Sequence, residues 1–219
     1  MDVQSTRELI CRLGRLLYEH NMTDVSSGNI SARAGKYICM TPCNAGSELF
    51  WDLQPEQILV IDQQGIKVDG VGEFPEEYKV HFQLYRNIPN GNSVIFCRAP
   101  YVMVFCAGGI PLLPFLENSR VFGEIGFCES KPSDSQELAD AVVLETEKNI
   151  QPLNTIAVPV MSPGHGLFVL GRTLTCAYEA VERIEANART ILLGSLLPRL
   201  DPNNHGLKGR KINGHNQVE

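Results

Sequence analysis

Residues 93–101 read SVIFCRAPY, an apolar run that is broken by Arg98 and ends at Pro100. The part from residue 93 to residue 97 predicts a short buried β-strand. Successive side chains of a strand point to opposite faces of a sheet, so Phe96 and Arg98 should face the same side. Cys97 should face the other side. We interpret it as a small buried hydrophobic residue.

Other short runs bounded by Gly, Pro, Asn or Asp also predict strands, at residues 36–40, 57–62, 155–160 and 166–170. Helical patterns lie between them. Capping boxes at Ser5-Thr6-Arg7-Glu8 and Ser133-Asp134-Ser135-Gln136 predict two helix starts. A third helix covers residues 76–86, and the longest runs from about Thr173 until Pro198 stops it.

The 219 residues, of which 43% are hydrophobic, are enough for one domain with a substantial core. We assign residues 1–197 to this domain. The composition changes after that to Asp, Asn, His, Gly, Lys and Gln, which predicts a polar, mobile tail over residues 198–219. We expect no active-site role for His205 and His215 in this tail.

The formal net charge of -6 argues against nucleic acid as a partner, because proteins that bind it present a basic face to the phosphates. We expect no signal peptide at the N-terminus, because these residues predict a helix. No apolar run approaches the roughly 18 residues that a membrane-spanning helix needs. The seven scattered cysteines are interpreted as reduced thiols. We therefore expect a cytoplasmic protein that binds neither nucleic acid nor a membrane.

A series of short motifs follows a fixed order along the chain. The motifs are Ser26-Ser27-Gly28-Asn29-Ile30-Ser31, Thr41-Pro42, residues 55–62 with Gly65, Glu77-Tyr78-Lys79-Val80-His81 with Tyr85 and Pro89, Pro100-Tyr101, Glu137-Leu138-Ala139, and Gly164-His165-Gly166 with Gly171 and Ala177. Together they resemble the class II aldolase/adducin family over about residues 5–195. The resemblance implies an α/β fold, namely a three-layer α/β/α sandwich around a largely antiparallel sheet. It also implies a homo-oligomer, usually a tetramer, with sites for a small-molecule ligand at subunit interfaces.

The resemblance also implies a metal site, which this chain alters. Enzymes of the family hold a divalent metal, commonly zinc, with a His-x-His pair on one strand and a third His before a glycine. Here Phe96 and Arg98 stand at the pair, and His165 is the one family ligand that matches. A single imidazole is a poor metal site. We expect no metal cofactor, with a divalent metal such as zinc as the remaining possibility.

The phosphate-binding elements that the resemblance implies are altered as well. Family members cradle a substrate phosphate with a Gly-Asn turn, a Thr-Pro-Ser-Gly loop and a Ser-Ser pair. In this chain Pro75 and Glu76 replace the serine pair, which removes a backbone donor and adds a negative charge. We therefore expect a ligand other than a sugar phosphate. The substrate-binding candidates are Gly28, Asn29, Thr41 and Asn44.

Three residues are the catalytic candidates. By the resemblance, Glu77 is the acid/base carboxylate, and burial would raise its pKa; the alternative is an exposed Glu in the first turn of a helix. Arg98 could place a permanent positive charge near the lost metal position, or it could be structural and form a salt bridge. His165 could act as a hydrogen-bonding or acid/base group. We interpret His81 as a packing residue.

Three hypotheses about function remain open. The first, which we favour, is an enzyme with a remodelled, metal-independent pocket that acts on a small carbonyl or carboxylate compound by proton transfer or carbon-carbon cleavage. The second is a non-catalytic domain for binding or assembly, like the adducin head domains. The third is a metal-dependent sugar-phosphate aldolase with atypical ligands, such as His165, Glu77 and a residue of a neighbouring subunit.

Overall fold

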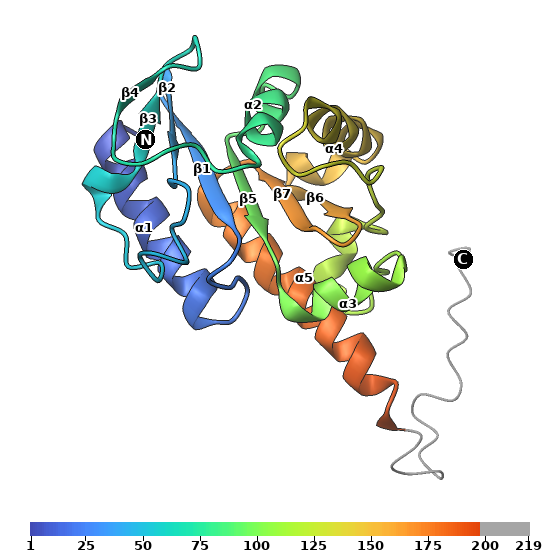
Figure 1. The fold of residues 1–219 in the computed structure, drawn as a ribbon. Helices are drawn as coiled ribbons and strands as arrows, with labels where there is room; N and C mark the ends of the chain where they lie inside the picture. The colour runs from blue at the N-terminus through green and yellow to red at the C-terminus, as the bar shows by residue number, and fades with distance from the viewer. Residues whose placement is uncertain (198–219) are drawn as a thin grey trace.

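The computed structural model describes residues 1–197, which form a seven-stranded sheet in the order β4-β3-β2-β1-β5-β7-β6 (Figure 1). All neighbouring strands pair antiparallel. The strands are β1 (Asn29–Ala34), β2 (Tyr37–Met40), β3 (Leu59–Ile61), β4 (Lys67–Asp69), β5 (Ser93–Cys97), β6 (Ala157–Ser162) and β7 (Gly166–Gly171).

Helices cover both faces of the sheet, with α2 and α4 on one face and α1, α3 and α5 on the other (Figure 1). The predicted α/β fold with helices flanking an antiparallel sheet is confirmed. The helices are α1 (Val3–Glu19), α2 (Tyr78–Asn87), α3 (Pro100–Gly108), α4 (Gln136–Lys148) and α5 (Leu174–Gly194), with short 3-10 turns at Pro55–Gln57, Glu117–Phe122 and Gln151–Asn154.

The alternation of side chains along β5 divides the core into two halves. Ile95 and Cys97 pack toward α1, α3 and α5, whereas Val94 and Phe96 pack toward α2 and α4. The prediction that Cys97 and Phe96 face opposite sides is therefore confirmed. Burial raises the pKa of the Cys97 thiol to about 12, as expected for an inert packing residue.

Three elements were not predicted from the sequence. Strand β1 reads NISARA, in which polar residues that face α2 alternate with Ile30 and two Ala residues, so it lacks the apolar run that predicted other strands. Strand β4 is short and exposed. Helix α3 begins at Pro100, where proline is favoured because the first turn needs no amide donor. Its apolar sequence gives no helical stripe that would distinguish it from a strand.

Both predicted capping boxes were wrong in position. In α1 the carboxylate of Asp2 accepts a hydrogen bond from the Ser5 amide, so Asp2 is the N-cap. In α4 the hydroxyl of Ser135, and not of Ser133, accepts from the Leu138 amide. The predicted start of the longest helix at about Thr173 is confirmed, because α5 begins at Leu174 and the Thr173 hydroxyl accepts from the Cys176 amide as its N-cap. The predicted stop at Pro198 and the tail with His205 and His215 lie outside the described residues.

Within residues 1–197, no helix combines the length and the apolar character that a membrane crossing requires. All seven cysteines are free in this part of the chain, which contains every one of them.

Candidate functional site

A buried row of polar side chains lies between β1 and α2. Asn29 Nδ2 donates to Glu77 Oε2 over 2.7 Å. Further along, Ser31 Oγ lies 2.7 Å from His81 Nδ1 and 2.7 Å from Tyr85 Oη. The positions of these residues in the sequence explain the row. Residues two apart, such as Asn29 and Ser31, share a face of a strand, and residues four apart, such as His81 and Tyr85, share a face of a helix. This arrangement explains why the β1 sequence is polar.

Glu77 is the N-cap residue of α2 and is 7% exposed, so the alternative of an exposed first-turn glutamate is wrong. The expectation that burial raises its pKa is also wrong. Burial does oppose the charged form, but contact with His165 and the hydrogen bond from Asn29 outweigh it and lower the pKa of Glu77. The carboxylate is therefore ionised at neutral pH.

His165 lies in the turn between β6 and β7, and its Nε2 is 3.1 Å from Glu77 Oε1. The distance is that of an ion pair, but the ring nitrogen is poorly aligned with the oxygen and makes no well-formed hydrogen bond. The imidazole is held instead by stacking on Phe96, with ring centroids 4.7 Å apart and planes 20° apart. His165 thus positions Glu77 from one side.

Phe96 fills the space beside His165 and is 1% exposed. Its ring also stacks on Phe168, with centroids 4.6 Å apart. A Cβ atom on Gly166 would lie 2.5 Å from Phe96 Cε2, so the glycine after His165 is required by the phenylalanine ring. The aromatic ring and the glycine therefore form one packed unit.

The residues present do not fit the metal that the family resemblance implies. Phe96 offers no donor atom, and the guanidinium of Arg98 is a cation. In the described chain no group of three or more His, Cys, Asp and Glu side chains is placed to hold a metal ion. The single imidazole of His165 and the carboxylate of Glu77 fall short of the four ligands that zinc usually takes.

Arg98 follows β5 directly and donates from Nε to the carbonyl oxygen of His165 over 2.9 Å. Neither Glu77 nor any other carboxylate within residues 1–197 lies at ion-pair distance from it, so the predicted structural salt bridge is not found. Burial opposes ionisation of Asp24, but hydrogen bonds from Ser26 and Ser27 lower its pKa and the charge of Arg98 adds to this. The guanidinium is therefore fixed at one nitrogen and forms no ion pair within residues 1–197, and Asp24 is the carboxylate whose charge it influences.

A small pocket of about 140 Å³ brings most of the predicted site residues together. Of the predicted residues, Gly28, Asn29, Asn44, Glu77 and Arg98 line it. The Oδ1 atom of Asn29 is buried and has no hydrogen-bond partner within the described chain, so a ligand could donate to it.

Two predicted residues do not line the pocket. Thr41 is fully buried, and its hydroxyl accepts from the Ile30 amide over 3.0 Å, which makes it a structural residue of the sheet. His165 is not among the lining residues, but it contacts two of them: its ring nitrogen lies near Glu77, and its carbonyl oxygen accepts from Arg98. The lining residues that were not predicted as site residues include several from the loops that flank Gly28 and Asn44, namely Val25, Ser26, Ser27, Ala45, Gly46 and Ser47.

The two loops over the pocket are tied together by Trp51. Its indole nitrogen donates to the carbonyl oxygen of Asp24 over 3.0 Å, and its side chain is 1% exposed. Gly28 has a φ of 105°, and a Cβ there would lie 2.4 Å from Thr23 Oγ1, so only glycine fits. Glu76 accepts a hydrogen bond from Ser133 Oγ over 2.9 Å, which directs its carboxylate toward the start of α4.

Comparison with known proteins agrees with the fold. Residues 8–192 match the model of the Class II Aldolase and Adducin N-terminal domain. An L-fuculose phosphate aldolase of Methanococcus maripaludis is 30% identical over 179 residues, which cover 81% of this chain and 91% of the relative. That of Methanococcus vannielii is 28% identical with the same coverage.

Solved structures show the same architecture. An L-fuculose 1-phosphate aldolase superposes with a TM-score of 0.77 at 20% identity, covering 88% of this chain and 87% of the other. YgbL of Klebsiella pneumoniae gives 0.76 at 22% identity, covering 90% and 91%. At such identities the likeness establishes the fold alone. The match over residues 8–192 and the relative that is 30% identical show that the chain belongs to the class II aldolase/adducin family.

Proposed function

We propose that this family member is a metal-independent enzyme that transfers a proton at the carbon beside the carbonyl group of a small carboxylate compound. One observation carries the proposal: Glu77 and Arg98 line the same pocket without pairing with each other. A base and a permanent cation that face one small space can act on the two ends of one reacting group.

The chemistry follows from the state of each side chain. Glu77 is ionised, so it can accept a proton from the carbon of the bound compound. The electron pair of the broken C–H bond moves onto the carbonyl oxygen, and the guanidinium of Arg98 stabilises that negative charge. The proton then returns to carbon, on the same or the opposite face. The same oxyanion would form if a carbon-carbon bond broke, which is the lyase form of this proposal.

The surrounding residues hold the base in place. Asn29 binds one carboxylate oxygen of Glu77, and His165 approaches the other. Both partners restrict the rotation of the side chain, which favours a fixed geometry for proton transfer. Because both oxygens are engaged, Asn29 and His165 are positioning residues in this proposal.

The pocket favours a small carboxylate over a sugar phosphate. Its volume of about 140 Å³ is below the roughly 300–1,000 Å³ of typical ligand sites, which suits a compound of a few carbon atoms. Pro75 has no amide donor for a phosphate, and the ionised Glu77 repels a phosphate, with its nearly two negative charges, more than a carboxylate with one. The planar guanidinium of Arg98 matches a carboxylate group.

A second candidate is a non-catalytic binding domain. The observation that favours it is the burial of Phe96, because the ring occupies space beside His165 that a larger substrate would need. A pocket that only binds would keep Arg98 as an anion-binding residue and would use Glu77 as a structural partner of Asn29.

Proton exchange distinguishes the two candidates. Three- and four-carbon keto and hydroxy acids are incubated with the protein in D2O, and loss of the C–H signal is followed by proton NMR. The enzyme proposal expects exchange for at least one compound, and loss of at least about 100-fold in Glu77→Gln. The matched control is Glu137→Gln at an exposed position of α4, which should exchange like the wild type. Saturable binding without exchange of any compound would favour the binding domain instead.

A further inference from the structure

A second and larger hollow lies at the far end of β1 and α2 from the candidate site. Its volume is about 560 Å³, within the range of small-molecule sites. Asn29 and Glu77, at the starts of β1 and α2, belong to the candidate site, whereas Arg33 and Arg86, near the ends of the same elements, line this hollow. The two sites are therefore separate.

Three cations line the hollow in a chain whose net charge is -6: Arg33, Lys36 and Arg86. None of them forms an ion pair with a carboxylate of the described residues. The one acidic residue of the lining is Asp62, and its Oδ1 accepts from the amides of Gln64 and Ile66, both over 2.9 Å. The Asp62 carboxylate thus accepts hydrogen bonds within its own turn and pairs with none of the three cations. The hollow therefore has an excess of positive charge, which attracts anions.

Arg33 is rigidly placed for this purpose. Its Nε donates to the Gly91 carbonyl oxygen over 3.1 Å, and an Nη atom donates to the carbonyl oxygen of Tyr85. The guanidinium lies 4.8 Å from the centre of the Tyr85 ring. Carbonyl groups orient this cation without cancelling its charge. Arg86 and Lys36 are exposed and can close on a ligand from the rim.

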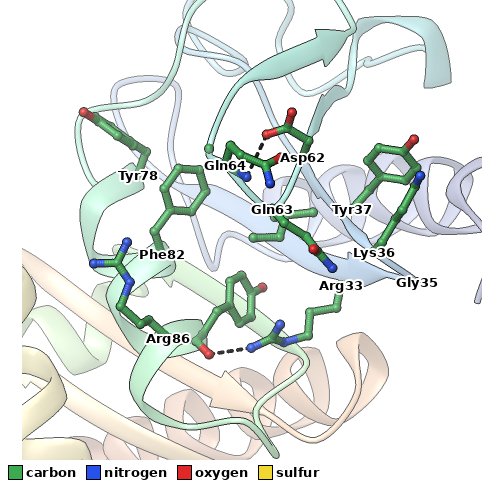
Figure 2. Close-up of a pocket in the computed structure, with 13 residues that line it drawn as sticks. Arg33, Gly35, Lys36, Tyr37, Asp62, Gln63, Gln64, Tyr78, Phe82 and Arg86 are labelled. Atoms are coloured by element: carbon green, nitrogen blue, oxygen red, sulfur yellow. Dashed lines mark hydrogen bonds between the residues drawn. The ribbon is translucent and has the colours of Figure 1, made fainter.

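Aromatic rings form the other part of the wall. Figure 2 shows Tyr78, Phe82 and Arg86 on one side of the hollow and Lys36 and Tyr37 on the other. Tyr78 and Phe82 are fixed in a cluster with Phe74, because Tyr78 stacks on Phe74 at 5.1 Å and meets Phe82 edge-on at 5.6 Å. Partly exposed and fixed rings offer a surface on which a flat ring can stack.

We propose that this hollow binds a nucleoside monophosphate. The separated cations suit the phosphate group, which carries nearly two negative charges and several acceptor oxygens. The rings of Tyr37, Tyr78 and Phe82 suit the base. The amide side chains of Gln63 and Gln64 lie between these walls and can both donate to and accept from the polar edge of a base (Figure 2).

Isothermal titration calorimetry with AMP, GMP, CMP and UMP tests the proposal, with adenosine and ribose 5-phosphate as the two halves of a nucleotide. At least one nucleotide should bind saturably, and each half should bind about tenfold more weakly or worse. Arg86→Glu and Lys36→Glu should each weaken binding by about tenfold. Both side chains are exposed, so the variants should keep the circular dichroism spectrum of the wild type.

The matched control is Arg12→Glu, because Arg12 is also exposed and forms no ion pair with the described residues. It lies on α1, which covers the opposite face of the sheet, and should bind nucleotides like the wild type. The proposal is overturned if no nucleotide binds at up to about 10 mM. It is also overturned if ribose 5-phosphate binds as well as the nucleotide, or if single-stranded RNA binds where mononucleotides do not. An Arg12→Glu variant that weakens binding as much as Arg86→Glu would likewise contradict binding in this hollow.

Discussion

The imidazole of His165 stacks on the ring of Phe96, with ring centroids 4.7 Å apart. By the family resemblance, His165 matches a metal ligand, and Phe96 stands where a second ligand would be. The contact therefore joins two of the three implied metal-ligand positions. Phe96 takes up the space beside the imidazole, while Arg98 holds the backbone of the same turn through the His165 carbonyl oxygen. Together they hold His165 against Glu77.

Truncating Phe96 should destabilise the fold strongly. Phe96→Ala removes a ring that is 1% exposed and stacks on both His165 and Phe168, so the free energy of unfolding should fall by about 3–5 kcal/mol. Urea unfolding followed by circular dichroism measures the loss. The control is Phe50→Ala, because Phe50 is 63% exposed and its truncation should cost less than about 1 kcal/mol. Equal losses for the two variants would contradict the packing role of Phe96.

Placing imidazoles at position 96 of β5 and at position 98, just after it, should create a zinc site. The double variant Phe96→His, Arg98→His places two donors on the side of the strand that faces His165 and Glu77. We expect it to retain about one zinc ion per chain after dialysis, measured by mass spectrometry of the metal content. Arg98→His alone leaves the Phe96 ring over His165 and should retain none. Stoichiometric zinc in the wild type would contradict our interpretation of the donor set.

Ser31 should stabilise the row of polar side chains between β1 and α2. Ser31→Ala leaves His81 Nδ1 and Tyr85 Oη without their shared partner at fully buried positions, and should cost about 1–3 kcal/mol in urea unfolding. Ser133→Ala removes a hydroxyl that bonds to Glu76 in an exposed contact and should cost clearly less. A neutral Ser31→Ala variant would show that buried water replaces the hydroxyl.

Acid should destabilise the protein through His81 and Glu77. Burial lowers the pKa of His81 from 6.5 to about 3, so between these values the unfolded chain binds a proton that the folded chain does not. The free energy of unfolding should therefore fall as the pH falls below 6.5, by up to about 1.4 kcal/mol per pH unit from this group. The lowered pKa of Glu77 acts in the same direction below its ordinary value of 4.5.

The variant His81→Leu isolates the contribution of this side chain. It should flatten the pH dependence of urea unfolding between pH 6.5 and 4.5. An unaltered slope in His81→Leu would mean that His81 is not the group that takes up the proton on unfolding.

Most of the fold could be predicted from the sequence, but less of the candidate site. Continuous apolar runs predicted β5 and β7 within one residue, because their side chains pack on both faces of the sheet. Strand β1 escaped prediction because only Ile30 and two Ala residues alternate with its polar side chains, and the contacts of these side chains with α2 join residues about 50 positions apart. Such contacts are set by tertiary structure, so the local alternation could not show that the polar side of β1 is buried.

The same reason limited the prediction of the site. The family resemblance identified Glu77, Arg98 and Asn29, and the structure places them around one pocket. It could not show that Arg98 would bond to the His165 carbonyl oxygen, or that contacts with His165 and Asn29 would lower the pKa of Glu77 despite burial. Thr41 was wrongly expected at the pocket, because its place in the motif does not reveal that its hydroxyl bonds within the sheet.

The most direct test of a metal-independent pocket that uses Glu77 and Arg98 is proton exchange before and after removal of metal ions. The protein is dialysed against a chelator, and exchange of the active keto or hydroxy acid in D2O is measured by proton NMR for the wild type and for Arg98→Met. We predict an unchanged rate after chelation and a loss of at least about 100-fold in Arg98→Met. Loss of exchange on chelation with recovery on addition of zinc, together with an active Arg98→Met variant, would contradict the account.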